Sequence, residues 1–278
     1  MATNSPTFLH TDTEARIGDN VHWGRDVVFG PNCRRVTVGY GAFIGDDVYI
    51  DVEELSIGDY FTLHHGSTLH GKTCAIGHNC WIGQYCILDS LGGRLSLGNN
   101  VGVGAHSQLW SHMKFGDRLA GCRWYRMESL DIGDDVWFVG HCIVAPIKAS
   151  SRSMLMVGGV AVKDMEANHV YAGSPAKDMT EKFGTQFDEV TQAQREAGFS
   201  EYLEEFRRQG HDTDFVRLVQ SREALIADGK HTPFCLSTRE YAPRYTPDEY
   251  RFMRFLLYDR AKFVPVAARA PLVRGESR

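Results

Sequence analysis

Long apolar runs, paired cysteines and a large excess of one charge are all missing from this sequence of 278 residues. No apolar stretch reaches the ~18 residues that a membrane helix needs, and residues 1–12 do not look like a signal peptide, so we expect a cytoplasmic protein. The net charge of −5 is spread along the chain and gives no reason to bind nucleic acid or a membrane surface. Seven cysteines without a CxxC pair argue against a disulfide framework or a thiolate zinc site.

Glycine, in contrast, is abundant, at 28 residues, and most of it falls in a six-residue repeat. Each unit begins with an apolar residue, which is usually followed by Gly, two polar residues and a small residue or valine. Repeats of this regularity indicate a solenoid, because one unit buries its apolar position only when neighbouring units stack on it. The eighteen units begin at Ile17, Trp23, Phe29; Val38, Ile44, Ile50; Ile57, Leu63, Leu69; Ile76, Ile82, Leu88; Leu97, Val103, Leu109; Ile132, Phe138 and Val144.

The units are grouped in threes. Their spacing is six residues inside each triplet, and extra residues always follow the third unit. This pattern predicts a three-sided coil of short strands with insertions at one corner, the apolar residue inside and the glycine at a sharp bend. Residues 146–156 are interpreted as a further, degenerate coil. The longest insertion separates Leu109 from Ile132, and a long loop at a solenoid corner is usually functional.

Beyond Lys177 the glycine pattern stops and helix signals begin. We therefore predict a mainly β domain over residues 1–180, with a long loop at 113–131, and a mainly α-helical extension over 181–278. The signals in the extension are a helix near Ser200–Arg208, a helix over Thr213–Asp228 capped by Gly229, a strand near Thr232–Ser237, a capping box at Thr246 that opens a helix to about Tyr258, and a loose tail from Arg269.

Three segments resemble the hexapeptide-repeat acyltransferases, especially the maltose- and galactoside-type O-acetyltransferases. IGDDVWFVGHCIVAP (132–146) is similar to a family coil with a VWIG motif, GGVAVKDMEANHVYAGSPAK (158–177) to the closing segment, and QLWSH with the loop after it to the "xTxxH" segment. The resemblance covers residues 15–180. It implies a left-handed parallel β-helix, a homotrimer with acetyl-CoA bound between subunits, and acetyl transfer to a hydroxyl of a sugar or similar small acceptor.

His112 is the expected general base. Imidazole can take a hydroxyl proton at neutral pH, and the long loop begins beside this residue. The resemblance also assigns roles to other residues, with no metal among them. It places Trp137 against the active site, Lys163 and Lys177 near CoA phosphates, Gly158, Gly159 and Ser174 along the pantetheine groove, and Asp89 and Ser90 at the acceptor; Arg123 and Trp124 in the loop are candidates for acceptor or subunit contacts.

Three alternatives stay open. N-acetylation of an amino sugar would use the same base, and an inactive trimeric scaffold would use none. His65 and His70 are spaced like zinc ligands of γ-class carbonic anhydrases, but a catalytic zinc needs three protein ligands and no third histidine matches that pattern. The small-residue position of the repeat holds Cys33, Cys80, Cys86 and Cys142, which we expect to be small buried hydrophobes.

Overall fold

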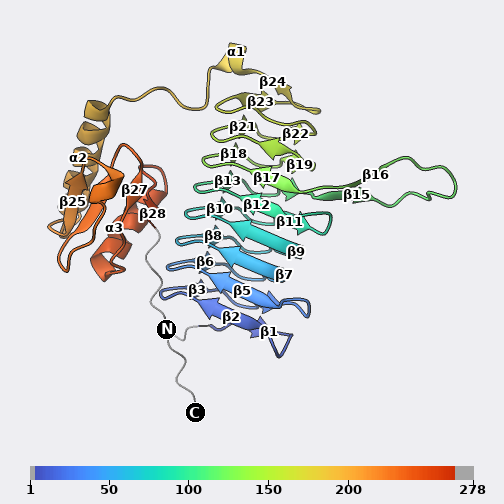
Figure 1. Ribbon diagram of the computed structural model, residues 1–278, viewed down its shortest axis with the longest axis horizontal. Coiled ribbons are helices and arrows are strands. Elements are labelled where there is room, and N and C mark those ends of the chain that lie inside the picture. The colour runs from blue at the N-terminus through green and yellow to red at the C-terminus, as the bar shows by residue number, and fades with distance from the viewer. Residues whose placement is uncertain (1–3, 267–278) are drawn as a thin grey trace. The chain divides into compact units, whose positions relative to one another are not determined.

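The computed structural model describes residues 4–266, and the chain divides into two compact units, Met1–Asp188 and Glu189–Arg278. The first unit is a coil of short parallel strands stacked in successive turns (Figure 1). The second unit combines helices with a small sheet. The tail expected from Arg269 lies outside the described residues.

Three faces, each a column of stacked strands, make up the coil. The first face holds β2 (Glu14–Ile17), β5 (Arg35–Val38), β12 (Leu95–Leu97), β17 (Leu130–Ile132) and β20 (Lys148–Ala149). The second holds β3 (His22–Trp23), β6 (Phe43–Ile44), β8 (Thr62–Leu63), β10 (Trp81–Ile82), β13 (Gly102–Val103), β18 (Trp137–Phe138), β21 (Met154–Leu155), β23 (Val170–Ala172) and β24 (Lys177–Asp178).

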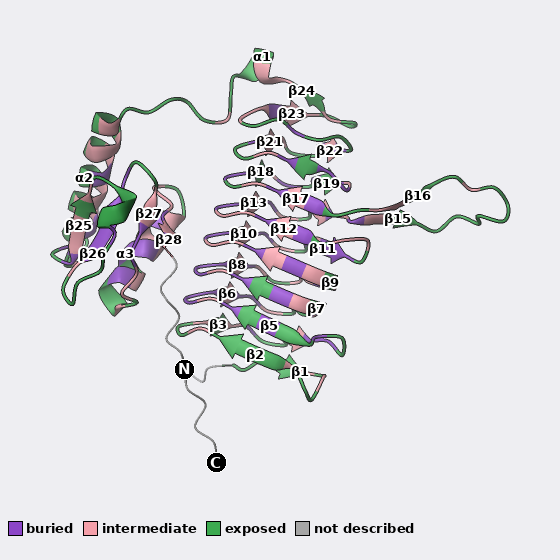
Figure 2. Ribbon diagram, in the orientation of Figure 1, coloured by how far each residue is buried: buried purple, intermediate pink, exposed green. Residues whose placement is uncertain are grey.

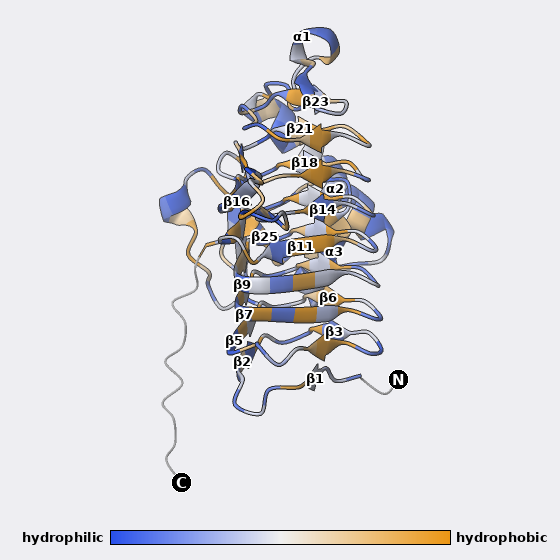
Figure 3. Ribbon diagram, turned by 90° about the vertical axis from the view of Figure 1, so that its right-hand side faces the viewer, coloured by the Kyte–Doolittle hydropathy of each residue, from blue (hydrophilic) through white to orange (hydrophobic). Residues whose placement is uncertain are grey.

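The third face holds β1 (Thr7–Phe8), β4 (Val28–Phe29), β11 (Ile87–Ser90), β14 (Gln108–Leu109), β19 (Ile143–Val144) and β22 (Val160–Ala161). β7 (Tyr49–Ile57) and β9 (Thr68–Ile76) run from the third face into the first without a break. Along β7, hydrophilic and hydrophobic residues alternate over most of the strand (Figure 3), as a strand with one buried side requires. A short helix, α1 (Thr180–Phe183), follows the last strand.

The strands stack in the register that the repeat predicts, so this prediction is confirmed. Repeat starts of successive coils pair directly and form one continuous core. The first coil, at the N-terminal end, is less covered, since Ile17 is exposed there. The degenerate coil continues the columns, with Ala149 and Leu155 buried. Examples of paired repeat starts are Val38–Ile57, Ile82–Val103 and Leu88–Leu109.

The repeat glycine serves the close approach of two coils. A Cβ atom on Gly24 would lie 2.3 Å from the carbonyl carbon of Gly45 in the next coil, a distance that no side chain tolerates. The left-handed backbone comes two residues later, at Asp26 (φ 54°) and Tyr85 (φ 53°). The expectation that this glycine forms the sharp bend is therefore wrong: Asn, Asp, His and Tyr residues with positive φ form most of the bends.

The four cysteines of the small-residue position are fully buried, which confirms their expected place: Cys33, Cys80, Cys86 and Cys142. The thiol of Cys86 donates to the carbonyl oxygen of Gly104 in the next coil (3.3 Å). Burial raises the pKa of the Cys86 and Cys142 thiols. These cysteines therefore pack the coil and stay protonated, so they are unsuited to nucleophilic chemistry.

The corner between the third and first faces carries the long insertion. There β15 (His112–Lys114) pairs antiparallel with β16 (Tyr125–Met127), and we call residues 112–127 the arm (Figure 1). Every residue of the arm is exposed or half-buried (Figure 2). Phe115, Leu119 and Trp124 are apolar and largely uncovered.

The second unit consists of α2 (Gln192–Arg208), α3 (Pro247–Leu257), a 3-10 turn at Arg222–Ala224 and a sheet in the order β25-β26-β27-β28. The strands are β25 (Val216–Val219), β26 (Thr232–Cys235), β27 (Glu240–Tyr241) and β28 (Val264–Pro265). Its core is a cluster of phenylalanines: Phe199, Phe206, Phe215, Phe234, Phe252 and Phe263.

Two of the helices expected in the extension are present. α2 covers Ser200–Arg208, and Thr246 caps α3 by accepting a hydrogen bond from the backbone N–H of Glu249. The strand expected near Thr232 is β26. The helix expected over Thr213–Asp228 is wrong, because β25 pairs in parallel with β26 over those residues and the 3-10 turn follows it.

Candidate active site

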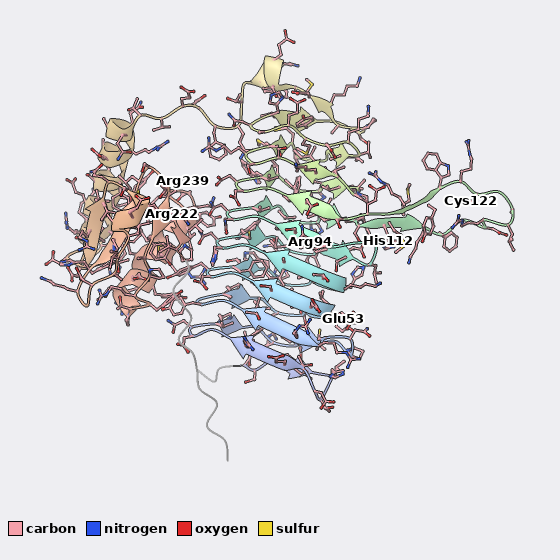
Figure 4. All side chains as sticks on the ribbon, in the orientation of Figure 1. Glu53, Arg94, His112, Cys122, Arg222 and Arg239 are labelled. Carbon is pink, nitrogen blue, oxygen red and sulfur yellow. The ribbon has the colours of Figure 1, made fainter. Side chains whose placement is uncertain are left out.

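His112 stands at the base of the arm, where the chain leaves the coil (Figure 4). β14 ends one residue before Trp110, whose backbone N–H still bonds to Val144 of the next coil. His112 then opens β15 opposite Met127. The imidazole is therefore held by a segment anchored both to the coil and to the arm, and 18% of its side-chain surface is exposed.

A carboxylate from the preceding coil fixes this imidazole. Asp89 on β11 is fully buried, and its Oδ2 atom lies 2.8 Å from Nδ1 of His112. Because a carboxylate can only accept, Nδ1 carries the proton and donates it to this bond. The lone pair of His112 is then on Nε2, which is the arrangement of a general base.

Four further donors converge on Asp89. The Oδ2 atom accepts from the backbone N–H (2.9 Å) and the hydroxyl (2.6 Å) of Ser111. The Oδ1 atom accepts from the backbone N–H of Leu91 (3.1 Å) and from Nε2 of His70 (3.2 Å). Burial opposes ionisation, but the bonds from His70, Ser111 and His112 outweigh it and hold the pKa of Asp89 well below its ordinary value. Asp89 is therefore a permanent anion behind the imidazole at neutral pH.

The acceptor contacts expected for Asp89 and Ser90 do not fit this environment. Their exposed fractions are 0% and 1%, and the Ser90 hydroxyl donates to the carbonyl oxygen of His70 (3.3 Å). Neither side chain is open to a small molecule. Asp89 instead orients His112, a role that the sequence reasoning missed although the third-face strand places Asp89 one coil below the histidine.

The indole of Trp110 lies between the two imidazoles that bind Asp89. Its ring centroid is 5.9 Å from that of His112, at an angle of 82°, and 6.3 Å from that of His70, at 68°. Its N–H donates to Oε1 of Gln108 (3.1 Å), which fixes its orientation. Three rings thus surround the buried carboxylate and restrict the access of water to it.

His65 and His70 do not converge. His65 lies edge-on to Tyr85 (centroids 5.2 Å apart), whereas His70 contacts Asp89. Among residues 4–266, no group of three or more His, Cys, Asp or Glu side chains is arranged to hold a metal ion. His65 and His70 therefore do not come together as a pair of metal ligands within the described part of one chain.

The residues expected at the acyl donor are dispersed over one chain. Trp137 (46% exposed) and Lys177 lie on the second face, and Lys163 follows β22 at the same corner as His112, two coils further along. Gly158, with φ 71°, lies between β21 and β22, and its neighbour Gly159 is buried. Ser174 is exposed between β23 and β24.

The arm carries the residues expected at the acceptor. Arg123 and Trp124 are exposed just before β16. The guanidinium of Arg118 lies 4.9 Å from the ring centroid of Tyr125, a cation–π contact within the arm. Cationic and aromatic groups thus project from the segment that begins at His112.

No protein-family model and no curated protein sequence matches this chain. Solved structures do match this chain over about two thirds of its length. The polysialic acid O-acetyltransferase OatWY is 17% identical, covers 68% of this chain and 93% of its own, and superimposes with a TM-score of 0.50. The polySia-specific acetyltransferase NeuO (16%; 68% and 90%; 0.40) and a maltose O-acetyltransferase of Clostridium difficile 630 (18%; 66% and 71%; 0.34) are also similar.

The likeness to OatWY decides the architecture. The first unit is a left-handed parallel β-helix. It has the hexapeptide-repeat acyltransferase fold that the sequence resemblance implied, and that prediction is confirmed at the level of the fold. No helix among the described residues is long and apolar enough to cross a membrane. The fold alone does not identify the activity, because one fold hosts many activities. The activity depends on the residues at the site.

Proposed function

We propose that this protein is an acyl-CoA-dependent acyltransferase that uses His112 as its general base. The acyl group is most simply acetyl, and the acceptor is a hydroxyl of a sugar or similar small polar molecule. The observation that carries this proposal is the buried Asp89–His112 pair at the corner where the hexapeptide coil opens into the arm.

The pair supplies what this reaction requires. A hydroxyl attacks a thioester slowly unless its proton is removed during the attack, and Nε2 of His112 is free to take it. The anionic Asp89 stabilises the imidazolium that forms. As the new C–O bond forms, the C–S bond breaks, and the proton passes from His112 to the departing thiolate. The products are the ester and free CoA, and His112 is again neutral.

The donor site is proposed to lie where two copies meet. An acyl-CoA molecule supplies the thioester. The ring of Trp137 suits a flat part of this donor, Gly158 leaves room for an apolar part, and the ammonium group of Lys177 suits the phosphates; all three residues are exposed. In a three-sided coil, the corner that bears His112 is opposite the second face that bears Trp137. A donor along the second face of one copy therefore reaches His112 of another, which favours a homotrimer with active sites between subunits.

The acceptor is proposed to meet the arm. Trp124 offers a ring face for a sugar, and Arg123 offers a fork of donors for hydroxyl or carboxylate oxygens. Both side chains are exposed on the hairpin that starts at His112, and neither forms part of the coil. They are therefore free to contact the acceptor.

The test is acceptor-dependent release of thiol from acetyl-CoA by purified full-length protein. Neutral, acidic and amino sugars form the acceptor panel, and mass spectrometry separates O- from N-acetyl products. With the best acceptor, His112→Ala should lower kcat by ~10²–10⁴, because the proton must then go to water. Circular dichroism and hydrodynamic size should not change.

His22→Ala provides a matched control. His22 stacks on Phe43 in the second face (centroids 4.6 Å apart) and plays no part in the proposed chemistry. Wild-type turnover in His112→Ala would remove the general base from the mechanism. The absence of acceptor-dependent thiol release across the panel would overturn the proposed activity for these acceptors.

A further inference from the structure

The hydroxyl of Ser111 bonds to the same carboxylate oxygen that holds the proposed base. Ser111 precedes His112 in the chain, is fully buried, and donates to Oδ2 of Asp89 (2.6 Å). We propose that Ser111 is a positioning residue: its hydroxyl holds Oδ2 of Asp89 against Nδ1 of His112 and thereby keeps the lone pair of His112 on Nε2. This inference rests on the proposed function of His112.

A backbone N–H decides where the proton of the Ser111 hydroxyl points. The N–H of Gly92, in the turn after β11, donates to Oγ of Ser111 (2.8 Å). A hydroxyl has one proton and a carboxylate can only accept, so the proton of Oγ lies in the bond to Asp89. The 2.6 Å distance is typical of a hydroxyl that donates to an anion. The order of donation is therefore fixed, from Gly92 through Ser111 to Asp89.

Ser111 is itself held by its backbone. Its N–H donates to Oδ2 of Asp89 (2.9 Å), and its carbonyl oxygen accepts from the N–H of Glu128 (3.0 Å). A Cβ atom on Gly92 would lie 2.0 Å from that carbonyl oxygen and 2.9 Å from Cβ of His112, so only glycine permits this close approach. Ser111 thus has a fixed position between the coil of Asp89 and the base of the arm.

The geometry at Oδ2 explains why one hydroxyl matters for His112. Oδ2 receives three donors, two from Ser111 and one from His112, whose Nδ1 lies 2.8 Å away. Without the hydroxyl, the carboxylate loses its shortest bond and the N–H of Gly92 loses its acceptor. Rotation of the carboxylate then lengthens the bond to Nδ1, and the imidazole is free to hold its proton on Nε2 instead. An imidazole in that form presents no lone pair to the acceptor.

The first experiment is Ser111→Ala in the thiol-release assay with full-length protein. We expect kcat to fall by ~10–10², with KM for the acceptor and for acetyl-CoA unchanged within ~2-fold, because the variant displaces the base without touching either substrate. Ser111→Cys separates the bond from packing, since a thiol fills the space of the hydroxyl but donates weakly. We expect its kcat to stay close to that of Ser111→Ala. Wild-type kcat in Ser111→Cys would show that Ser111 only fills space, which would overturn the proposal.

Ser67→Ala is the matched control, because Ser67 makes the same pair of bonds elsewhere in the coil. Ser67 is fully buried, accepts from the N–H of Cys86 (3.0 Å) and donates to the carbonyl oxygen of Gly83 (2.9 Å). Loss of its hydroxyl should cost comparable stability without reaching Asp89, so we expect wild-type kcat. Denaturant titration compares the stability of the two variants. An equal fall of kcat in Ser67→Ala and Ser111→Ala would make the role of Ser111 structural and the proposal wrong.

The tautomer of His112 can also be followed without substrate. Histidine-selective nitrogen NMR of the full-length protein, with His112→Ala to assign the signals, distinguishes a proton on Nδ1 from a proton on Nε2. Neutral His112 should hold its proton on Nδ1 in wild type and in Ser67→Ala, whereas Ser111→Ala should add the Nε2–H form. A pure Nδ1–H form in Ser111→Ala would contradict the proposed role.

The two proposals fail separately. Loss of activity in His112→Ala, with wild-type kcat and tautomer in Ser111→Ala, removes only the role of Ser111. A mixed tautomer in Ser111→Ala, in a protein that transfers no acyl group, supports the role of Ser111 at the Asp89–His112 pair and overturns the assigned activity.

Discussion

At the scale of the residue, the site depends on one buried carboxylate. Asp89 is inaccessible to any substrate, yet it fixes the tautomer of His112 and accepts five hydrogen bonds from four residues. A buried charge of this kind is tolerated only because hydrogen-bond donors contact both carboxylate oxygens. Its replacement therefore changes both catalysis and stability, and the two effects can be measured apart.

We expect Asp89→Asn to lower kcat by ~10²–10⁴, because an amide does not enforce the Nδ1–H tautomer or stabilise an imidazolium. The stability effect should depend on pH. The folded state holds the pKa of Asp89 below the unfolded value of about 3.9, so its contribution is full above about pH 5 and is lost as the pH falls toward the lower folded pKa.

Denaturant titrations followed by tryptophan fluorescence test the second part. All five tryptophans lie in the first unit, so the signal reports that unit and not the second. The difference in unfolding free energy between wild type and Asp89→Asn should be constant above about pH 5 and shrink below about pH 4. A difference that stays the same at acid pH would contradict the lowered pKa.

At the scale of the element, the arm is separate from the structure that supports it. Its residues are exposed or half-buried, whereas the coil beneath it carries the continuous core. The base of the arm holds His112, and its outer part is proposed to contact the acceptor. Shortening the outer part therefore distinguishes acceptor selection from catalysis.

Replacing Phe115–Trp124 by Asn-Gly should leave the coil folded. Lys114 and Tyr125 are cross-strand partners, so a two-residue turn closes the hairpin at that pair. We expect KM for the acceptor to rise at least ~10-fold, since the proposed acceptor contacts of Arg123 and Trp124 are lost, while KM for acetyl-CoA changes little. The double variant Arg123→Ala/Trp124→Ala is the matched comparison; an unchanged acceptor KM in both would show that the arm serves only subunit packing.

At the scale of the whole molecule, the coil separates the two halves of the proposed site. His112 lies at the corner between the third and first faces, and Trp137 is exposed on the second face. One copy thus presents the proposed base and Trp137 of the proposed donor site on different sides. Assembly of identical copies would unite them, and this requirement can be tested by mixing variants.

Co-expression of His112→Ala and Trp137→Ala chains with different tags should restore activity. Each homo-oligomer should be impaired, but a mixed oligomer contains a site with His112 from one copy and Trp137 from another. Tandem affinity purification, light scattering and thiol release measure the mixed species. Two differently tagged His112→Ala chains are the control. Activity no higher than in the parent variants would place the whole site within one chain.

Periodicity predicted the coil but not the second unit's sheet. Each repeat start has a pairing partner one coil away, so local spacing and tertiary contact agree across the eighteen repeat units. Around Val216 they disagree: the sequence signals predict a helix, but parallel pairing with Thr232–Cys235 makes the segment a strand. The local sequence does not distinguish a helix from a strand here, because the strand forms only by pairing with a segment further along the chain.

The sequence alone determined the three-sided coil, its register, the corner that accepts insertions and the position of His112 on it, because a six-residue repeat is a local property. Only the tertiary structure decided that Asp89 binds His112, that His70 shares that carboxylate and that neither Asp89 nor Ser90 is accessible to an acceptor. The reason is that these contacts join side chains from successive coils. Their spacing is set by insertions and hydrogen-bond geometry, on which the repeat itself carries no information.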